Sequence, residues 1–257
     1  MSIFSSQRAT FLCLIGLIAT ACDQVNEPPV VYSPEPTIDD LIQTVITSDS
    51  NFTDVSFASL IETSTGHQVL PVDAAAKVDQ EIIAGIRRAM AQTLDRMNRP
   101  ESPTNQERRI NECSAHFEEA IRHFVNAQPG LECELPRTAE GNLQRAGYPD
   151  LRIVHQSSGR VAYLDPKLVE TGSLGSSLRT FYFTPKAETG KVLDDAHHLL
   201  IGIEHDGNTG KWQFLRWHLV DLAEFKVRLK AEFQADNRDI YRPELILESG
   251  EPEKPKD

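Results

Sequence analysis

The chain has few positive charges and no apolar run long enough to cross a membrane. Lys and Arg total 26 against 38 Asp and Glu, so the formal net charge is −12. This balance excludes a uniformly basic nucleic-acid-binding protein, because such proteins hold polyanions through excess positive charge. The main apolar run, residues 9–21, is too short to span a bilayer as a helix.

Several motifs of common enzyme classes are also absent from the sequence. It contains no Walker phosphate-binding loop, no dinucleotide-binding fingerprint and no Gly-x-Ser-x-Gly nucleophile elbow. It also shows no internal repeat. The usual nucleotide-binding and serine-hydrolase patterns therefore give no indication of function.

The N-terminus has the pattern of an export signal. Arg8 precedes the apolar run, which ends in the small residues Ala19, Thr20 and Ala21 before Cys22. This order resembles the lipobox of bacterial lipoproteins, in which that cysteine is acylated and becomes the new N-terminus. We expect residues 1–21 to be a signal peptide and lipid-modified Cys22 to anchor the chain at the periplasmic side of a membrane. Ordinary secretion without the lipid, or a cytoplasmic location, are the alternatives.

Cysteine usage agrees with export. Cys13 lies in the expected signal peptide and Cys22 at its end, so Cys113 and Cys133 remain as a pair. In an oxidising compartment an even remainder predicts a disulfide between them. The alternative is two buried free thiols.

Composition and periodicity divide the chain into five parts. After the signal come a Pro-rich acidic linker (22–37), an N-terminal helical region (38–103), an α+β domain (104–243) and an acidic tail (244–257). Helical spacing of apolar residues predicts helices at 39–47, 73–98, 104–127 and 223–234. Short apolar runs punctuated by glycine predict strands at 151–155, 161–164, 178–183, 199–204 and 213–222.

This order of elements predicts an α+β fold, with N-terminal helices followed by a mixed or antiparallel sheet meander and flanking helices. The acidic charge is concentrated outside the predicted domain. Residues 23–40 carry five acids and no base, whereas residues 137–242 carry fifteen bases and fourteen acids. The second half is thus close to neutral and can hold a local basic groove.

Two acids and a lysine stand at the ends of a predicted hairpin. Asp150 begins one strand, and Asp165 and Lys167 end the next. If residues 157–160 form the turn, the carboxylates meet at one edge of the sheet and Lys167 projects from the face of Asp165. Two carboxylates suit Mg²⁺, and a neighbouring amine can orient or deprotonate a water. Because Pro166 has no N–H group, we expect Asp165 at a strand's end or at an edge.

Pro149, Asp150, Asp165 and Lys167 resemble the motif of the PD-(D/E)xK nuclease superfamily. The resemblance covers about residues 104–241 and implies a restriction-endonuclease-like core, with Mg²⁺ (or Mn²⁺) as cofactor and nucleic acid as substrate. It further implies an acid on the preceding helix facing the metal, for which Glu118 is the choice, while no small-molecule cofactor is expected. The oligomeric state is not indicated.

Other interpretations stay open. Asp150 can be a turn residue and 165–167 a polar strand exit, the fold can be nuclease-like without activity, or the protein can be a non-enzymatic envelope lipoprotein that binds a protein or envelope component. A histidine metal site near His197, His198 and His218 is a weaker hypothesis, since neighbouring strand residues face opposite sides. Arg216 belongs to a scattered set of basic residues that can contact phosphate or simply face solvent.

Overall fold

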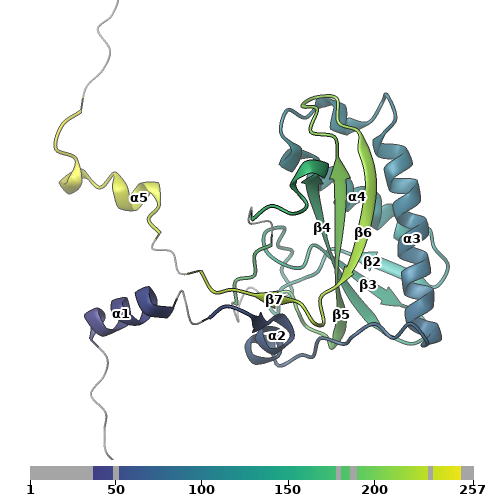
Figure 1. Ribbon diagram of the computed structural model, residues 1–257, viewed down its shortest axis with the longest axis horizontal. Coiled ribbons are helices and arrows are strands. Elements are labelled where there is room, and N and C mark those ends of the chain that lie inside the picture. The colour runs from purple at the N-terminus through teal and green to yellow at the C-terminus, as the bar shows by residue number, and fades with distance from the viewer. Residues whose placement is uncertain (1–36, 49–51, 178–180, 186–189, 231–233, 250–257) are drawn as a thin grey trace, which may run out of the picture. The chain divides into compact units, whose positions relative to one another are not determined.

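The computed structural model describes residues 37–48, 52–177, 181–185, 190–230 and 234–249 (Figure 1). The chain divides into two compact units, residues 1–42 and 43–257, and the sheet and the candidate site described below lie in the second. The described helices are α1 (Ile38–Ser48), α2 (Phe57–Thr65), α3 (Lys77–Met97), α4 (Ser114–Asn126) and α5 (Asn237–Ile240). The short 3-10 helices are η1 (Pro103–Gln106), η2 (Ile110–Cys113), η3 (Thr171–Ser173) and η4 (Pro243–Leu245).

A five-stranded mixed sheet forms the centre of the second unit. Its order is β2-β3-β4-β5-β6, in which β4 and β5 are parallel and the other neighbours antiparallel. The bounds of these strands are β2 (Leu131–Glu134), β3 (Leu151–His155), β4 (Val161–Glu170), β5 (Ala196–His205) and β6 (Phe214–Asp221). The predicted α+β fold with a mixed sheet meander is therefore confirmed, and it is compatible with a restriction-endonuclease-like core.

The two faces of the sheet pack against different partners. Alternate residues such as Leu164, Leu199 and Ile203 form one core with apolar residues of α3 and α4. On the other face, Tyr163 of β4 packs in a second cluster around Phe57. Helix α3, from the expected N-terminal helical region, packs in the same core as α4 and the sheet of the expected α+β domain. The division of the chain into these two parts stays a prediction.

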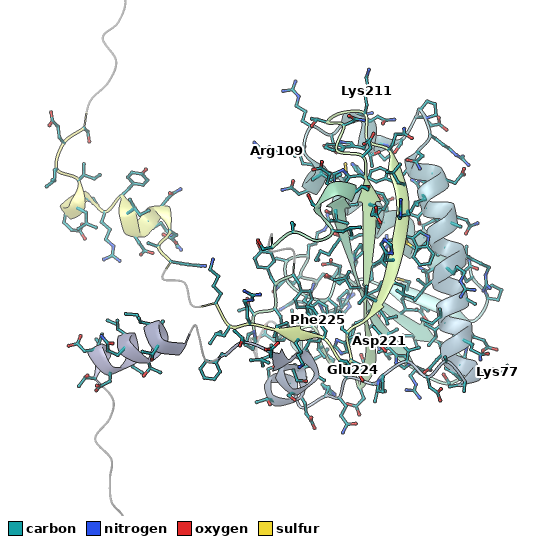
Figure 2. The ribbon with its side chains drawn as sticks, viewed as in Figure 1. Lys77, Arg109, Lys211, Asp221, Glu224 and Phe225 are labelled. Atoms are coloured by element: carbon teal, nitrogen blue, oxygen red, sulfur yellow. The ribbon has the colours of Figure 1, made fainter. Side chains whose placement is uncertain are left out.

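The second cluster is joined to a small two-stranded sheet. β1 (Val55–Ser56) pairs antiparallel with β7 (Lys226–Val227), and the Phe57 amide donates to the Phe225 carbonyl at 2.9 Å. Figure 2 shows Phe225 beside this ribbon. The expected helix at 223–234 is thus wrong in its described part, because strand pairing takes these backbone groups. Residues 231–233 lie outside the described part of the chain.

Two other expectations for local structure are wrong. The single helix expected at 104–127 is interrupted, because Glu107 and Arg109 have extended backbone and the Trp212 indole donates to the Glu107 carbonyl at 3.1 Å. The strand expected at 178–183 is absent at 181–183, where Phe181 packs edge-on against Phe57 instead; residues 178–180 are outside the described residues. Helix α2 and strand β2 were not expected.

The expected disulfide is wrong: Cys113 and Cys133 are free and buried. Both belong to the core between α4 and the sheet, where cysteine acts as a small apolar residue. Burial raises the pKa of the Cys113 thiol to about 11 and that of Cys133 to about 12. Neither residue therefore has the exposed thiolate that disulfide exchange requires. The expected lipid site, Cys22, lies outside the described residues, and among those described no helix is long and apolar enough to cross a membrane.

We expect alkylation of the native protein to leave Cys113 and Cys133 unmodified, since both thiols are buried and protonated. Peptide mass mapping after iodoacetamide treatment measures this, with the denatured protein as the control in which both peptides react. Recovery of a cross-linked Cys113–Cys133 peptide from unreduced protein would contradict the assignment.

A buried histidine makes the stability of the fold sensitive to acid. His198 is fully buried, and its Nδ1 forms a 2.7 Å hydrogen bond with the Tyr148 hydroxyl. Burial lowers the pKa of His198 from 6.5 to about 3. Between these values the unfolded chain binds a proton that the folded chain excludes, so stability is full above pH 6.5 and falls as the pH drops below it.

Between about pH 7 and about pH 5, His198 alone is expected to remove about 2 kcal/mol from the free energy of unfolding. Urea unfolding at the two pH values measures the loss. His198→Asn keeps an acceptor near the Nδ1 position and should lose less stability over this interval than the wild type, whereas His123→Asn, on the exposed side of α4, is the control. Equal losses in wild type and His198→Asn would exclude this role for His198.

Candidate active site

Two carboxylates and a lysine meet where β3 separates from β4. The β3–β4 ladder ends at the Leu151–Leu164 pair. Asp150, just before Leu151, and Asp165, just after Leu164, are the first residues beyond it. Lys167 follows Asp165 by two positions and lies on the same face. Its Nζ atom is 2.5 Å from Asp165 Oδ2 and 3.7 Å from Asp150 Oδ2. The structure thus brings together the three residues that the sequence motif singled out.

We expected Asp165 at a strand's end or at an edge. It lies in the middle of β4 and not at its end, but at an edge that β3 leaves unpaired, so the second of the two expected positions is confirmed. β4 continues to Glu170 and pairs with β5 throughout, including the Pro166–Ile201 pair. Pairing with β3, however, stops at Leu164. Beyond that residue no strand of the described residues pairs with this edge of β4, so a proline without an N–H group removes no ladder hydrogen bond there.

The site concentrates charge in a buried place. Asp165 is only 2% exposed, and burial raises its pKa to about 7, with the Asp150 charge adding to the rise and the Lys167 charge opposing it. Water screens the charges of such buried carboxylates only weakly, so two of them repel one another unless a cation neutralises them. Lys167 supplies that positive charge in the structure.

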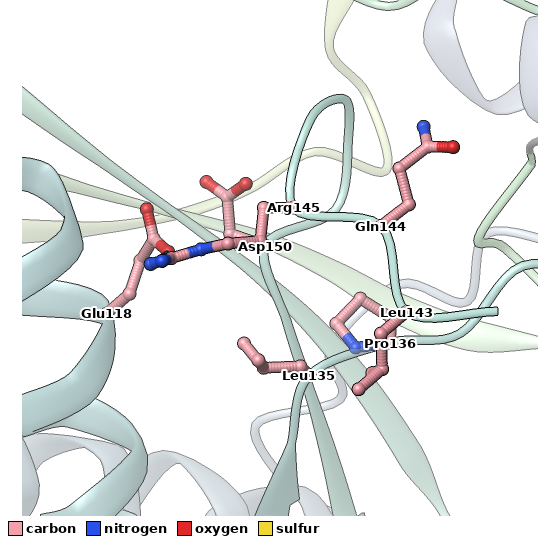
Figure 3. A pocket seen from close by; sticks show the side chains of 7 residues that line it. All are labelled: Glu118, Leu135, Pro136, Leu143, Gln144, Arg145 and Asp150. Atoms are coloured by element: carbon pink, nitrogen blue, oxygen red, sulfur yellow. Dashed lines mark ion pairs between the residues drawn. The ribbon is translucent and has the colours of Figure 1, made fainter.

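Glu118, on α4, lies beside Asp150. The two residues line one small pocket together with Arg145, and Figure 3 shows Arg145 reaching between their side chains. Arg145 Nη2 is 3.9 Å from Glu118 Oε2. Burial raises the pKa of Glu118, and the charge of Asp150 raises it further. The next residue, Glu119, is exposed.

Lys191 is a site residue that the sequence reasoning missed. It is 2% exposed, and its ammonium group donates to the Gln144 carbonyl at 3.3 Å. Burial lowers its pKa, while the charges of Asp150, Asp165 and Glu118 partly restore it. Lys191 therefore adds a buried lysine to the carboxylate cluster, beside the partly exposed Lys167. It belongs to no short motif, because it lies in the long connection between β4 and β5.

Hydrogen bonds to the sheet fix the segment that carries Lys191. Asp194 accepts from the Tyr163 hydroxyl at 2.6 Å and from Arg152 Nε at 2.8 Å. The Leu193 amide donates to the same tyrosine hydroxyl at 2.9 Å. These bonds hold the end of the β4–β5 connection on β3 and β4, close to the strands that carry the carboxylates. Arg152 and Tyr163 thus position Lys191 without lying in the site.

The aromatic cluster positions Asp150 from the other side. Tyr148, two residues earlier, is buried and packs edge-on against Phe57 with ring centroids 5.6 Å apart. Its hydroxyl is bonded to His198 on β5, and a cis peptide bond joins it to Pro149. The start of β3 is therefore anchored to β5 across β4, which places Asp150 beside Asp165.

The donor set suits a hard divalent cation. Among the described residues, no group of three or more His, Cys, Asp and Glu side chains is arranged to hold a metal ion. Mg²⁺ does not need such a group, because one or two carboxylates with water and substrate phosphate commonly hold it. Asp150 and Asp165 fit that requirement. Glu118 does not complete a group of three with them, and its role as a ligand stays a prediction.

The histidines have other partners. His197 lies on the α3 side of β5, where its Nδ1 donates to the Leu70 carbonyl at 2.8 Å and its Nε2 is 3.0 Å from Asp79 Oδ1. His198 faces the opposite side and bonds to Tyr148. The expected opposite orientation of these two residues is confirmed.

Comparison with known proteins agrees with this geometry. A family model described as the Type II restriction enzyme MjaV family matches residues 50–244. The Type II restriction enzyme MjaV of Methanocaldococcus jannaschii is 29% identical over 203 residues, which cover 75% of this chain and 87% of the relative. The matched range contains the central strands β4 and β5 and all the site residues named above. The chain belongs to the Type II restriction enzyme MjaV family.

Proposed function

We propose that this protein hydrolyses phosphodiester bonds in DNA with the help of a divalent metal ion. The observation that carries the proposal is the convergence of Asp150, Asp165 and Lys167 at the divergence of β3 and β4. Membership of a restriction-enzyme family supports nuclease chemistry, and the relative's name supports DNA as the substrate class. The intact set of charged groups favours an active site over a degenerate one.

Each residue has a role that its surroundings support. Asp150 and Asp165 hold the cation, for which we propose Mg²⁺ with Mn²⁺ as the alternative. When bound, such an ion stabilises negative charge on the phosphate under attack. Lys167, in contact with both carboxylates, orients the attacking water or takes its proton. Glu118 acts from the neighbouring helix through a water.

Lys191 balances the charge of the site. The charges of Asp150, Asp165 and Glu118 act on its ammonium group, and so does the charge of Lys167, the other lysine of the site. A phosphodiester brings one more negative charge, so a site with Lys167 alone would repel its substrate more strongly. We therefore propose that Lys191 lowers this repulsion and helps to keep the buried carboxylates ionised.

We expect Asp165→Ala and Lys167→Ala each to lower the cleavage rate by about 10²- to 10⁴-fold, since each removes a group that acts on the reacting atoms. The recognition sequence is unknown, so the assay uses long duplex DNA of many sequences with Mg²⁺, Mn²⁺ or EDTA. Glu118→Gln should cost about 10-fold, as expected for a group acting through a ligand or water.

Glu119→Gln is the matched control for Glu118→Gln, because it removes an equal charge from the exposed neighbour on α4. Its cleavage rate should equal that of the wild type. The proposal is refuted if the wild type cuts none of the DNA with either metal, or if Asp165→Ala and Lys167→Ala cut as fast as the wild type.

Export and membrane anchoring through Cys22 remain a separate part of the proposal, supported by the sequence pattern of residues 8–22. In bacteria that produce the protein, we expect it in the membrane fraction, with mature N-terminal peptides that begin at an acylated Cys22. Cys22→Ser should move it out of that fraction. Mass spectrometry that finds an intact N-terminus at Met1 would exclude export and leave the nuclease proposal unaffected.

A further inference from the structure

The sheet face that carries Asp165 and Lys167 continues across β5 onto β6. Register places Lys167 opposite Gly202 on β5, and Gly202 opposite His218 on β6. Residues paired in this way point to the same face of a sheet. The opposite face at this level holds Leu168, Ile203 and Trp217 in the core under α3 and α4.

Gly202 leaves a gap in the middle of this row. A Cβ atom built there would meet no heavy atom of the described residues within 4 Å. Neighbouring strands are about 4.8 Å apart, so Lys167 and His218, two strands apart, are separated by about 10 Å across the gap. Phosphates of one DNA strand follow each other every ~3.4 Å along the helix axis, so the row spans a few of them.

The exposed side chains of Arg216 and His218 lie on β6 beyond the gap, above a buried acid. Glu204, on β5, has a side chain that is 0% exposed, whereas those of Arg216 and His218 are 62% and 48% exposed. His218 Nε2 is 2.5 Å from Glu204 Oε1, and Arg216 Nε is 3.5 Å from Glu204 Oε2. A buried carboxylate is costly unless it is paired, so Glu204 restrains both side chains on this face.

We propose that Arg216 and His218, held in place by Glu204, bind the DNA backbone beside the scissile phosphate. This inference rests on the proposed function, since it takes the Asp165–Lys167 pair as the point of cleavage. Gly202 lets the DNA backbone approach the sheet between Lys167 and His218, the two ends of the row. Such contacts fix the position of the duplex and carry no base specificity.

The charge of the chain makes a local site of this kind necessary. With a net charge of −12, the protein as a whole repels a polyanion. Binding then depends on those cations that stand next to the cleavage site. An alternative for Arg216 and His218 is that they only neutralise Glu204, and the experiment below separates the two roles.

The test measures binding of a fluorescein-labelled DNA duplex in EDTA by anisotropy, at salt concentrations from about 50 to about 200 mM. Arg216→Gln is expected to weaken binding about 3- to 10-fold and to reduce the slope of log K against log salt by about 1. Arg216→Lys should recover part of the affinity, because it restores the charge without the fork geometry.

Three further variants control for misfolding, for positioning and for charge elsewhere on the surface. Glu204→Gln/Arg216→Gln removes the buried acid together with its arginine partner, so it leaves no unpaired buried carboxylate, and it should show the same loss of affinity. Glu204→Gln alone keeps Arg216 and His218 and measures the contribution of their positioning. Arg87→Gln removes an exposed cation from α3, which covers the opposite face, and should bind as the wild type does.

The inference is overturned if Arg216→Gln and the double variant bind with wild-type affinity and salt slope, or if the wild type binds no duplex. Because binding and its salt dependence are measured in EDTA, neither result depends on cleavage. A wild type that binds DNA through Arg216 but cuts none of it with Mg²⁺ or Mn²⁺ would instead refute the proposed function alone.

Discussion

The candidate site depends on one constraint: β3 stops pairing with β4 in the middle of β4. The two strands share a ladder as far as the Leu151–Leu164 pair, beyond which Asp150 precedes Leu151 on one strand and Asp165 follows Leu164 on the other. Asp150 and Asp165 stand at that point. Because β5 continues to support β4 on its other edge, the strand stays extended through Lys167 despite Pro166. A hairpin of ordinary length would have ended β4 before the lysine.

Burial of charge sets the second requirement. Asp165 and Lys191 are each almost inaccessible to solvent, and neither could stay charged alone. The structure meets this with mixed charges from four separate segments, contributed by α4, the start of β3, the middle of β4 and the end of the β4–β5 connection. Lys167 holds the two carboxylates together, while the Tyr163–Asp194–Arg152 network fixes the segment of Lys191.

Much of the fold followed from local patterns. Strands β3 to β6 and helix α3 were predicted from the spacing of their apolar residues. The predicted hairpin of β3 and β4 places Asp150 and Asp165 next to each other, as expected. The errors have tertiary causes. Trp212 holds Glu107 extended and divides the expected long helix, and pairing with β1 turns the expected last helix into β7. Lys191 had no local signal, because only contacts with distant strands bring it to the site. The disulfide was expected from the predicted export of the protein and from the number of remaining cysteines. Neither of these determines whether the two thiols lie close enough to bond.

The position of Tyr148 links the site to the stability of a distant part of the chain. It lies two residues before Asp150, yet its ring packs with Phe57, which begins α2, and its hydroxyl bonds to His198 in β5. Local unfolding of α2 or the β1–β7 ribbon would therefore release the residue that aligns one carboxylate with the other. Segments more than ninety residues apart along the chain share one cooperative unit here, so the geometry of the candidate site exists only while the whole cluster around Phe57 is assembled. A substitution at Phe57 would therefore disturb the alignment of Asp150 with Asp165 without touching either residue.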